Sequence, residues 1–514
     1  MRAQYWISLV SNVPGWPMRW LRRIIHNRWT YHSLYRSRLF TQHRIFQEPI
    51  VFQLQRRFSL SSCSPFLLPP LIFTGLVLTL WTYKCLMMII FQNKIIYMPS
   101  IPPFSRREKV EDYAPQTRPV VWREHDLQAE DGVALKMLEG RIESWGSPGI
   151  DKQKQVAVLY FQGNASSLPP RLPFLSNILK SIEAINATNT NAAGRSSVFS
   201  ASPSSFSSSS ASTTSHQIPS LEFKQGTSYT IYALSYRGFW RSRGRASQAG
   251  IELDVQAALK WLSRHVLNQK TLPTEGMAKL VLWGQSIGAG VATVGTATAM
   301  AATQTKRNDA RISGAHAASK SSSGLVHGLI LETPFLSMRH MLSALYPQPF
   351  LPYKYLWPFL SSTWDSIAAM KTIGQFNKRC RESAQDINEN GNNNAHHCYS
   401  HSSLPHASTP SSTESVQLSN VLILQAGKDE LVPAWHAERL EQLCRRYLGD
   451  GSGLDSSEEQ QQRQQQQDPR QHKPQTYSKT SIQRVVIPNA LHTEVMATKK
   501  GRDAVVDFLM KLSG

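Results

Sequence analysis

Ser286 lies in the sequence Gly-Gln-Ser-Ile-Gly at residues 284–288, a pattern that suits a nucleophilic serine. Glycines two positions before and two after the serine leave room for the crowded backbone of a sharp strand-to-helix turn. The pattern alone is weak, because an ordinary tight turn can carry the same residues by chance. The apolar run 280–283 before it and the small residues after it predict a buried strand and a closely packed helix. This context favours a nucleophile.

Asp429 and His492 each follow a late apolar run, VLILQA at 421–426 and QRVVI at 483–487. An imidazole can remove the serine proton, and an aspartate can hold that imidazole in the required tautomer. The residue order Ser, Asp, His therefore predicts a catalytic triad of Ser286, Asp429 and His492. Three other carboxylates compete with Asp429 for the role of the acid: Glu332, Asp365 and Glu430.

Residues 162–166 (QGNAS) follow another apolar run, VAVLYF at 156–161. In a serine hydrolase, backbone N–H groups from such a loop and from the residue after the nucleophile stabilise the oxyanion. We expect the N–H groups of Asn164 and Ile287 to form this oxyanion hole, with Ala165 as an alternative donor. A plain Gly-Asn turn would have the same residues.

Eight short runs with the character of strands predict the scaffold that positions these residues. The first two surround Glu130-Asp131-Gly132 and predict a hairpin. The others alternate with helical or loop stretches, so we expect an α/β fold with a mostly parallel eight-stranded sheet flanked by helices. Its chemistry should lie at the carboxyl ends of the strands. The runs are 120–127, 133–142, 156–161, 229–235, 280–283, 325–331, 421–426 and 483–487.

The net charge of +21 at a pI of about 9.8 raises the possibility of a nucleic-acid partner. Residues 1–65 hold ten arginines, no lysine and one acidic residue, which gives +9 of that charge. No motif that reads RNA or DNA accompanies them, so we predict no nucleic-acid partner. The five cysteines form neither a metal-binding pattern nor a disulfide framework, and we expect no metal and no cofactor.

Residues 66–91 are apolar apart from Lys84 and are long enough to cross a bilayer. We predict a single transmembrane anchor here; the alternative is a helix that lies on the membrane surface or packs on the rest of the protein. The basic tail, residues 1–65, also resembles a mitochondrial transit peptide. We favour a cytosolic tail and expect an endoplasmic reticulum or other endomembrane location, with a mitochondrial one as the alternative.

The remaining residues, 93–514, form the predicted catalytic domain, which low-complexity segments interrupt. These segments are rich in Ser, Asn or Gln and lie between the predicted elements, where loops tolerate insertions. We expect them to be disordered and to add nothing to the core. They span about 186–220, 302–324, 379–416 and 449–481.

Several ordered motifs resemble the membrane-anchored α/β-hydrolase-domain family, which is related to fungal bud-emergence proteins and more distantly to protein depalmitoylases. They include NKIIYMP, YFQGNAS, YRGFWRSRGRASQAGIELD, WGQSIGAGVAT, LETPFLS, YKYLWPFLSSTWDS, GKDELVP and NALHTEV. The resemblance implies an α/β-hydrolase fold with Ser286 as nucleophile, Asp429 as acid and His492 as base. Gln162 departs from it, because relatives commonly have His before Gly-Asn. An N-terminal cluster of cysteines, typical of the depalmitoylases, is also missing.

These observations predict a membrane-anchored serine hydrolase that cleaves ester or thioester bonds of acyl lipids or acylated proteins. The aromatic segment 335–364 would form a small cap, and an apolar cap beside a membrane anchor favours an acyl-chain substrate; the same aromatic residues could instead merely cover the sheet. The alternative function is a catalytically silent hydrolase fold that acts as a membrane scaffold for polarity or trafficking partners.

Overall fold

The computed structural model describes residues 66–143, 154–196, 227–267, 278–312, 326–394, 418, 420–449 and 480–513. The chain divides into the units Met1–Leu76 and Val77–Gly514, and the sheet belongs to the second. The predicted basic tail, residues 1–65, lies outside the described residues. So do most of the four low-complexity segments.

Eight strands form one sheet in the order β1-β2-β4-β3-β5-β6-β7-β8. β1 pairs antiparallel with β2, and β2 antiparallel with β4, which confirms the predicted hairpin. All other neighbours are parallel. The strands are β1 Val120–Gln128, β2 Ala134–Ile142, β3 Lys154–Phe161, β4 Thr227–Ser235, β5 Lys279–Gln285, β6 Val326–Glu332, β7 Asn420–Ala426 and β8 Ser481–Ile487.

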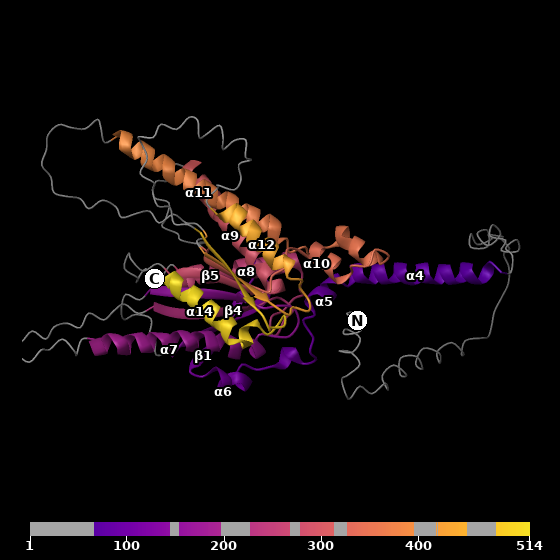
Figure 1. Ribbon diagram of the computed structural model, residues 1–514, viewed down its shortest axis with the longest axis horizontal. Helices are drawn as coiled ribbons and strands as arrows, with labels where there is room; N and C mark the ends of the chain where they lie inside the picture. Colours follow the sequence, from indigo (N-terminus) through magenta and orange to yellow (C-terminus); the bar gives the residue numbers. More distant parts are fainter. Residues whose placement is uncertain are drawn as a thin grey trace, which may run out of the picture. The chain divides into compact units, whose positions relative to one another are not determined.

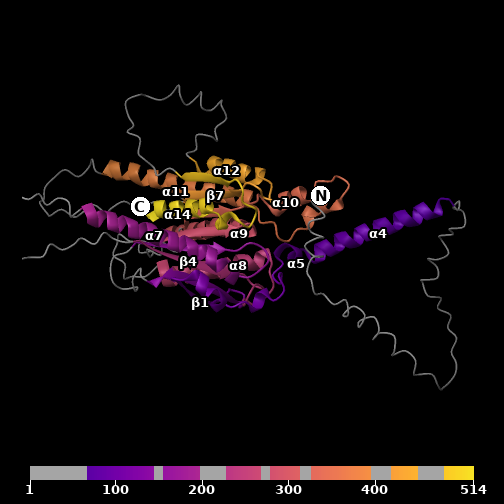
Figure 2. The same cartoon turned by 60° about the horizontal axis from the view of Figure 1, so that its bottom comes forward.

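Helices cover both faces of the sheet (Figure 1). Successive residues of β3 alternate between two hydrophobic clusters, one under α8, α9, α11 and α12 and the other under α7 and α14. The rotated view shows the same two layers (Figure 2). A strand covered on both faces must be apolar throughout, which explains the continuous runs in the sequence. The longer helices are α7 Leu172–Ser196, α8 Gln248–Leu262, α9 Ile287–Ile312, α10 Met338–Leu345, α11 Ser366–Asn394, α12 Trp435–Leu448 and α14 Lys499–Ser513.

Shorter helical turns lie mainly before β1 and in the connections. They are α5 Gln92–Tyr97, η2 Ser105–Arg107, η3 Glu111–Tyr113, α6 Ala114–Thr117, η5 Pro169–Arg171, η6 Ser263–Leu267, η7 Pro352–Phe359 and η8 Val495–Ala497.

Three of the predicted low-complexity segments begin inside helices. α7, α9 and α11 continue into the segments that start at 186, 302 and 379. None of the helical stretches beyond these starts contains proline, so nothing in their composition forces the helix to end at the core. The predicted segments are defined by their composition, and the first residues of these three are helical in the structure.

Helix α4, Leu68–Ile90, is the one helix in the described part of the chain that is long and apolar enough to cross a membrane. Its mean hydropathy is 1.6, and none of its residues is buried. At 1.5 Å per residue it is roughly 34 Å long, which matches the hydrocarbon thickness of a bilayer. α4 is therefore a candidate membrane span.

A buried ion pair joins the loop after β4 to helix α8. The Arg237 guanidinium donates to Asp254 Oδ1 at 2.8 Å and to Asp131 Oδ2 at 2.6 Å. Asp254 is fully buried, and this burial raises its pKa to about 6. The sequence motif YRGFWRSRGRASQAGIELD therefore contains a structural ion pair between its second residue, Arg237, and its last residue, Asp254.

Replacing Arg237 with alanine is expected to lower the free energy of unfolding by about 3–5 kcal/mol, because Asp254 loses its buried partner. Arg241→Ala is the matched control, since Arg241 is 43% exposed and pairs with Glu124 at the surface. That change should cost less than about 1 kcal/mol. Thermal unfolding of the full chain in detergent measures both variants, and equal losses would contradict the proposed role of the buried pair.

Candidate active site

Ser286 occupies the tight turn between β5 and α9. Its φ of 54° lies in the left-handed region, which a side chain other than glycine rarely adopts. A Cβ on Gly284 would lie 1.9 Å from the carbonyl oxygen of Gly288, and one on Gly288 would lie 2.2 Å from that of Phe161. Both glycines are therefore required for β3, β5 and α9 to approach so closely, as the GQSIG pattern predicts.

The structure brings Ser286, His492 and Asp429 together, although 206 residues separate Ser286 from His492. His492 Nε2 lies 2.8 Å from Ser286 Oγ, and His492 Nδ1 lies 2.9 Å from Asp429 Oδ2. The side chains of His492 and Asp429 are 3% and 6% exposed. This arrangement can transfer the serine proton to the imidazole while the carboxylate holds the opposite ring nitrogen.

Asp429 is fixed by its own loop after β7. Its Oδ1 accepts the backbone N–H groups of Leu431 at 2.9 Å and Val432 at 2.7 Å. Neighbouring Glu430 accepts the backbone N–H of His492 at 3.0 Å. The Glu430 side chain therefore holds the backbone of His492, while the Asp429 side chain contacts the imidazole ring of His492.

Asp365 has a structural position. Its Oδ1 accepts the backbone N–H groups of Ile367 and Ala368 at the start of α11, at 3.0 Å and 3.1 Å. This is the geometry of a helix N-cap. Asp365, one of the competing acids, therefore caps α11 and has no hydrogen bond to His492 among the described residues.

Glu332, the remaining competing carboxylate, lies buried at the end of β6 beside the turn. Its backbone carbonyl accepts the Ser286 N–H at 2.8 Å, and its side chain accepts from Gln285 Nε2 at 2.9 Å. Burial raises the pKa of Glu332 to about 7, although Gln285 and Trp283 donate to the carboxylate. Glu332 thus supports the turn that holds the serine and has no hydrogen bond to His492 among the described residues.

Arg171 completes this network, although no sequence motif indicates it. Its guanidinium donates to Gln285 Oε1, from η5 to the residue before the serine. Tyr160 Oη approaches the same oxygen at 3.4 Å. Because the arginine lies 114 residues before Gln285, only the packing of η5 against the sheet brings the two together.

The loop after β3 lies against the turn, as expected for an oxyanion hole. A Cβ on Gly163 would be 3.6 Å from Ser286 Cβ. In the described part of the chain, the backbone N–H groups of Asn164 and Ile287 donate to no protein acceptor. The N–H of Ala165 donates to the carbonyl of Tyr97 at 2.9 Å, so the alternative donor is occupied.

Gln162 is fully buried, and its side-chain amide has no hydrogen-bond partner among the described residues. Its backbone carbonyl accepts from Tyr236 Oη at 2.9 Å. Leaving a buried amide without a hydrogen-bond partner costs about 1–3 kcal/mol. The stability of the fold therefore does not explain why Gln162 occupies this position. The position that departs from the resembled family therefore holds a buried polar side chain without a protein partner, next to the candidate oxyanion loop.

Asp429→Asn is expected to lower kcat by roughly 10⁴-fold, because asparagine would hold the imidazole in the wrong tautomer. Glu430→Gln should stay within about tenfold of the unchanged enzyme, since a glutamine oxygen can still accept the His492 N–H. Steady-state hydrolysis of an acyl ester measures both. An equal loss of kcat in the two variants would contradict the role of Asp429 as the acid of the triad.

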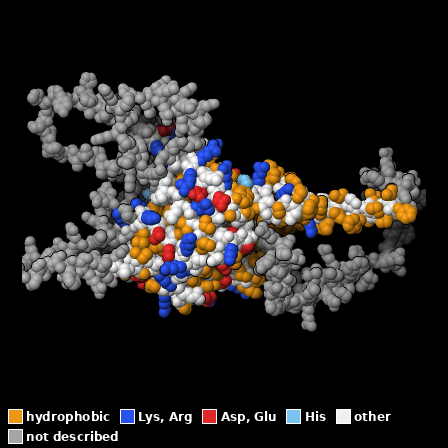
Figure 3. Space-filling model, viewed as in Figure 1, with side chains coloured by type: hydrophobic (Ala, Val, Ile, Leu, Met, Phe, Trp, Pro, Cys, Tyr) orange, Lys and Arg blue, Asp and Glu red, His pale blue; other side chains and the backbone are white. Residues whose placement is uncertain are grey.

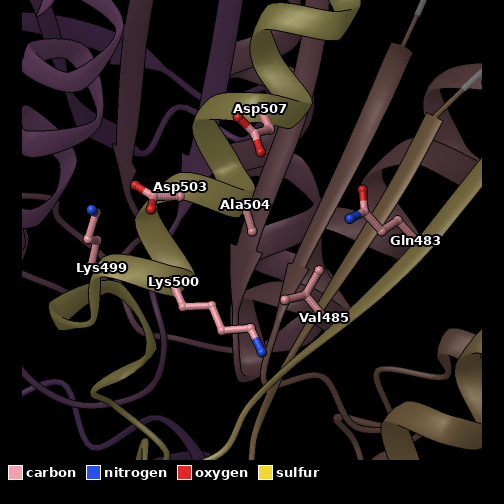
Figure 4. Close-up of a pocket in the computed structure, with 7 residues that line it drawn as sticks. All are labelled: Gln483, Val485, Lys499, Lys500, Asp503, Ala504 and Asp507. Atoms are coloured by element: carbon pink, nitrogen blue, oxygen red, sulfur yellow. The ribbon is translucent and has the colours of Figure 1, made fainter.

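A separate open hollow lies between β8 and α14 at the edge of the sheet (Figure 4). Lysine and aspartate side chains from the start of α14 surround it together with residues of β8. None of the Ser286, His492 or Asp429 side chains lines it. Its lining residues are Gln483, Val485, Lys499, Lys500, Asp503, Ala504 and Asp507.

The sequence matches no model of a known protein family. Among curated proteins it is similar to Protein bem46 of Schizosaccharomyces pombe, with 32% identity over 133 residues. That match covers 26% of this chain and about a third, 34%, of the yeast protein. It is also similar to the alpha/beta hydrolase domain-containing protein WAV2 of Arabidopsis thaliana, with 23% identity over 299 residues, 56% of this chain and 69% of the plant protein.

Solved structures with some similarity include two archaeal esterases. The Pyrococcus furiosus esterase Pf2001 has 11% identity and a TM-score of 0.37, over 79% of this chain and 94% of that chain. The Pyrobaculum calidifontis esterase has 13% identity and a TM-score of 0.36, over 80% of this chain and 90% of that one. TM-scores this low carry no argument about function. The strand order and the tight turn between β5 and α9 show that the chain has the α/β-hydrolase fold, and its sequence is similar to parts of bem46 and WAV2.

Proposed function

We propose that this α/β-hydrolase is a membrane-anchored serine hydrolase that cleaves carboxylic ester or thioester bonds of acyl lipids or acylated proteins. The 2.8 Å contact between Ser286 Oγ and His492 Nε2, with Asp429 on the other ring nitrogen, supports the proposal most strongly. Helix α4 supports the membrane anchor by its length and composition.

In the proposed mechanism, His492 Nε2 takes the proton of Ser286 while Oγ attacks the carbonyl carbon of the substrate. The oxyanion that forms accepts hydrogen bonds from the N–H groups of Asn164 and Ile287. The intermediate collapses when the bond to the leaving oxygen or sulfur breaks, and His492 passes its proton to that atom. An acyl group remains on Ser286.

Hydrolysis of this acyl-enzyme repeats the same steps with water. His492 removes a proton from the water, whose oxygen attacks the acyl carbon, and then returns that proton to Ser286 Oγ as the acid leaves. Asp429 stabilises the imidazolium in both halves. Each residue thus ends the cycle in its starting protonation state.

The cap supports an acyl substrate. Thr333 to Trp364 connects β6 to α11 and contains α10 and η7, in which no residue is buried. A Cβ on Gly290, in the first turn of α9, would lie 3.0 Å from Trp364 Cβ and 3.6 Å from Phe335 Cζ. The two ends of the cap therefore pack on the helix that follows the nucleophile, which places the cap beside the site.

The test is turnover by the purified full chain in detergent, with p-nitrophenyl acetate, octanoate and palmitate and with a palmitoyl thioester. We expect hydrolysis of at least one of the longer acyl substrates, loss of that activity in Ser286→Ala, and unchanged activity in Ser343→Ala, which removes an exposed hydroxyl of α10. If Ser286→Ala has the same rate as the unchanged chain on every substrate, the silent scaffold is the better account.

A further inference from the structure

The cap has an exposed apolar surface. It consists of five large side chains from α10, η7 and the turn between them, and these are 42–68% exposed. α10 packs on η7, where the Arg339 guanidinium lies 3.9 Å from the centre of the Trp357 ring. Protein surfaces in contact with water rarely group apolar side chains in this way. The cap surface comprises Leu345, Phe350, Tyr355, Trp357 and Phe359.

Two cations lie among these aromatic side chains. Residues 338–364 contain Arg339 and Lys354, and the first acid, Asp365, follows at the start of α11, where its carboxylate caps the helix. Lys354 Nζ lies 5.0 Å from the centre of the Tyr355 ring. Figure 3 shows hydrophobic and basic side chains side by side over this part of the molecule. Aromatic residues with nearby cations are typical of a membrane interface.

The cap surface is fastened to the segment that follows α4. Gln92, the first residue of α5, donates from Nε2 to the carbonyl of Phe359 at 3.1 Å and accepts the backbone N–H of Ser361 at 2.7 Å. The next residue, Asn93, accepts from the hydroxyl of Ser362 at 3.1 Å. α4 ends at Ile90, so only Phe91 separates the apolar helix from this connection.

The segment after α4 continues the same chemistry. Phe91, Ile95, Ile101 and Phe104 are 42–72% exposed. Lys94 Nζ lies 5.3 Å from the Phe91 ring centre. Exposed apolar side chains with adjacent cations therefore occur both on the cap and on the segment after α4, which the hydrogen bonds of Gln92 join.

We propose that the cap surface contacts the lipid bilayer, with its aromatic side chains among the headgroups and upper acyl chains. This inference rests on the membrane anchoring proposed above. If α4 spans the bilayer, Gln92 lies within about 3 Å of the helix end along the axis, at 1.5 Å per residue. Its hydrogen bonds then hold Phe359 at the level of the interface.

Photocrosslinking tests the contact without altering the chain. The full-length protein is reconstituted in phosphatidylcholine and phosphatidylserine vesicles that contain a phospholipid with a diazirine in its acyl chain, and labelled peptides are mapped by mass spectrometry. We expect label in peptides of 66–91 and of 345–360, and at least tenfold less in the β1–β2 hairpin, 120–142. Label in 66–91 without label in 345–360 would overturn the inference and indicate a protein partner for the cap. Absence of label from 66–91 would instead contradict the anchor itself.

A matched pair of variants tests which side chains make the contact. Phe350→Ser combined with Phe359→Ser should lower labelling of 345–360 at least fivefold and leave that of 66–91 unchanged. Phe174→Ser is the control, because Phe174 is also exposed, at 41%, but lies on α7. It should leave both regions unchanged. Equal cap labelling in the double variant and the unaltered chain would contradict a lipid contact through these rings.

Discussion

Replacing His492 with alanine is expected to lower kcat for ester hydrolysis by roughly 10⁵–10⁶-fold, with little change in KM. The imidazole lies 2.8 Å from Ser286 Oγ and is the one group in the described residues that contacts this hydroxyl. Without it, no base removes the serine proton and no acid protonates the leaving group. Residual activity would come from substrate binding and the oxyanion donors. Single-turnover hydrolysis of an acyl ester measures the loss.

A surface histidine, His265, serves as the control for this variant, and a buried one, His436, has a structural position. His265→Ala changes an exposed ring on η6 that stacks on Trp261, and should stay within about twofold of the unchanged rate, as is usual for a surface substitution. His436 is buried on α12, its Nδ1 accepts the Leu336 N–H at 3.2 Å, and burial lowers its pKa to about 4. A loss in His265→Ala equal to that in His492→Ala would contradict the assignment of the base.

Gly284→Ala is expected to destabilise the fold by at least about 4 kcal/mol, which is among the largest effects of a single substitution. Its Cβ would lie 1.9 Å from the carbonyl oxygen of Gly288 and 2.5 Å from the N of Ala289, both backbone atoms at the start of α9. Relief requires that α9 move away from β5, which lies between β3 and β6 in the sheet. Thermal unfolding and protease resistance of the full chain measure the effect.

Gly163→Ala is the matched control for this change. Gly163 lies in the adjoining loop, where a Cβ would meet its nearest neighbours at 3.5–3.6 Å, which is ordinary van der Waals contact. We expect an unfolding temperature close to that of the unaltered chain. Equal unfolding temperatures for Gly284→Ala and Gly163→Ala would contradict the close packing of β5 against α9.

The central strands could be predicted because they are buried on both faces. The run 156–161 is the buried part of β3, whose first two residues are half-buried. The edge strand β8 contains the run 483–487 but is mostly only partly buried. The residues of the candidate site follow from the same pattern, since each stands just after a strand. What the sequence could not decide was the choice among four carboxylates, because that choice depends on side-chain direction.

The support of the site was not predictable from the sequence. Arg171, Gln285 and Glu332 come from η5, β5 and β6, and they meet only once the sheet and its covering turn have formed. The connection of Gln92 to Phe359 likewise joins residues 267 positions apart. Local patterns contain no information on such pairs. The ends of α7, α9 and α11 likewise have a polar composition that does not by itself indicate a helix.

The most direct test of Ser286 as an activated nucleophile is labelling with a fluorophosphonate probe, which forms a covalent bond to the oxygen of such a serine. The purified full chain, Ser286→Ala and Ser343→Ala are treated in parallel, and the labelled peptide is identified by mass spectrometry. We expect one label on Ser286 in the unaltered chain and in Ser343→Ala, and none in Ser286→Ala. Equal labelling of all three proteins, or no labelling of the folded unaltered chain, would contradict a serine hydrolase.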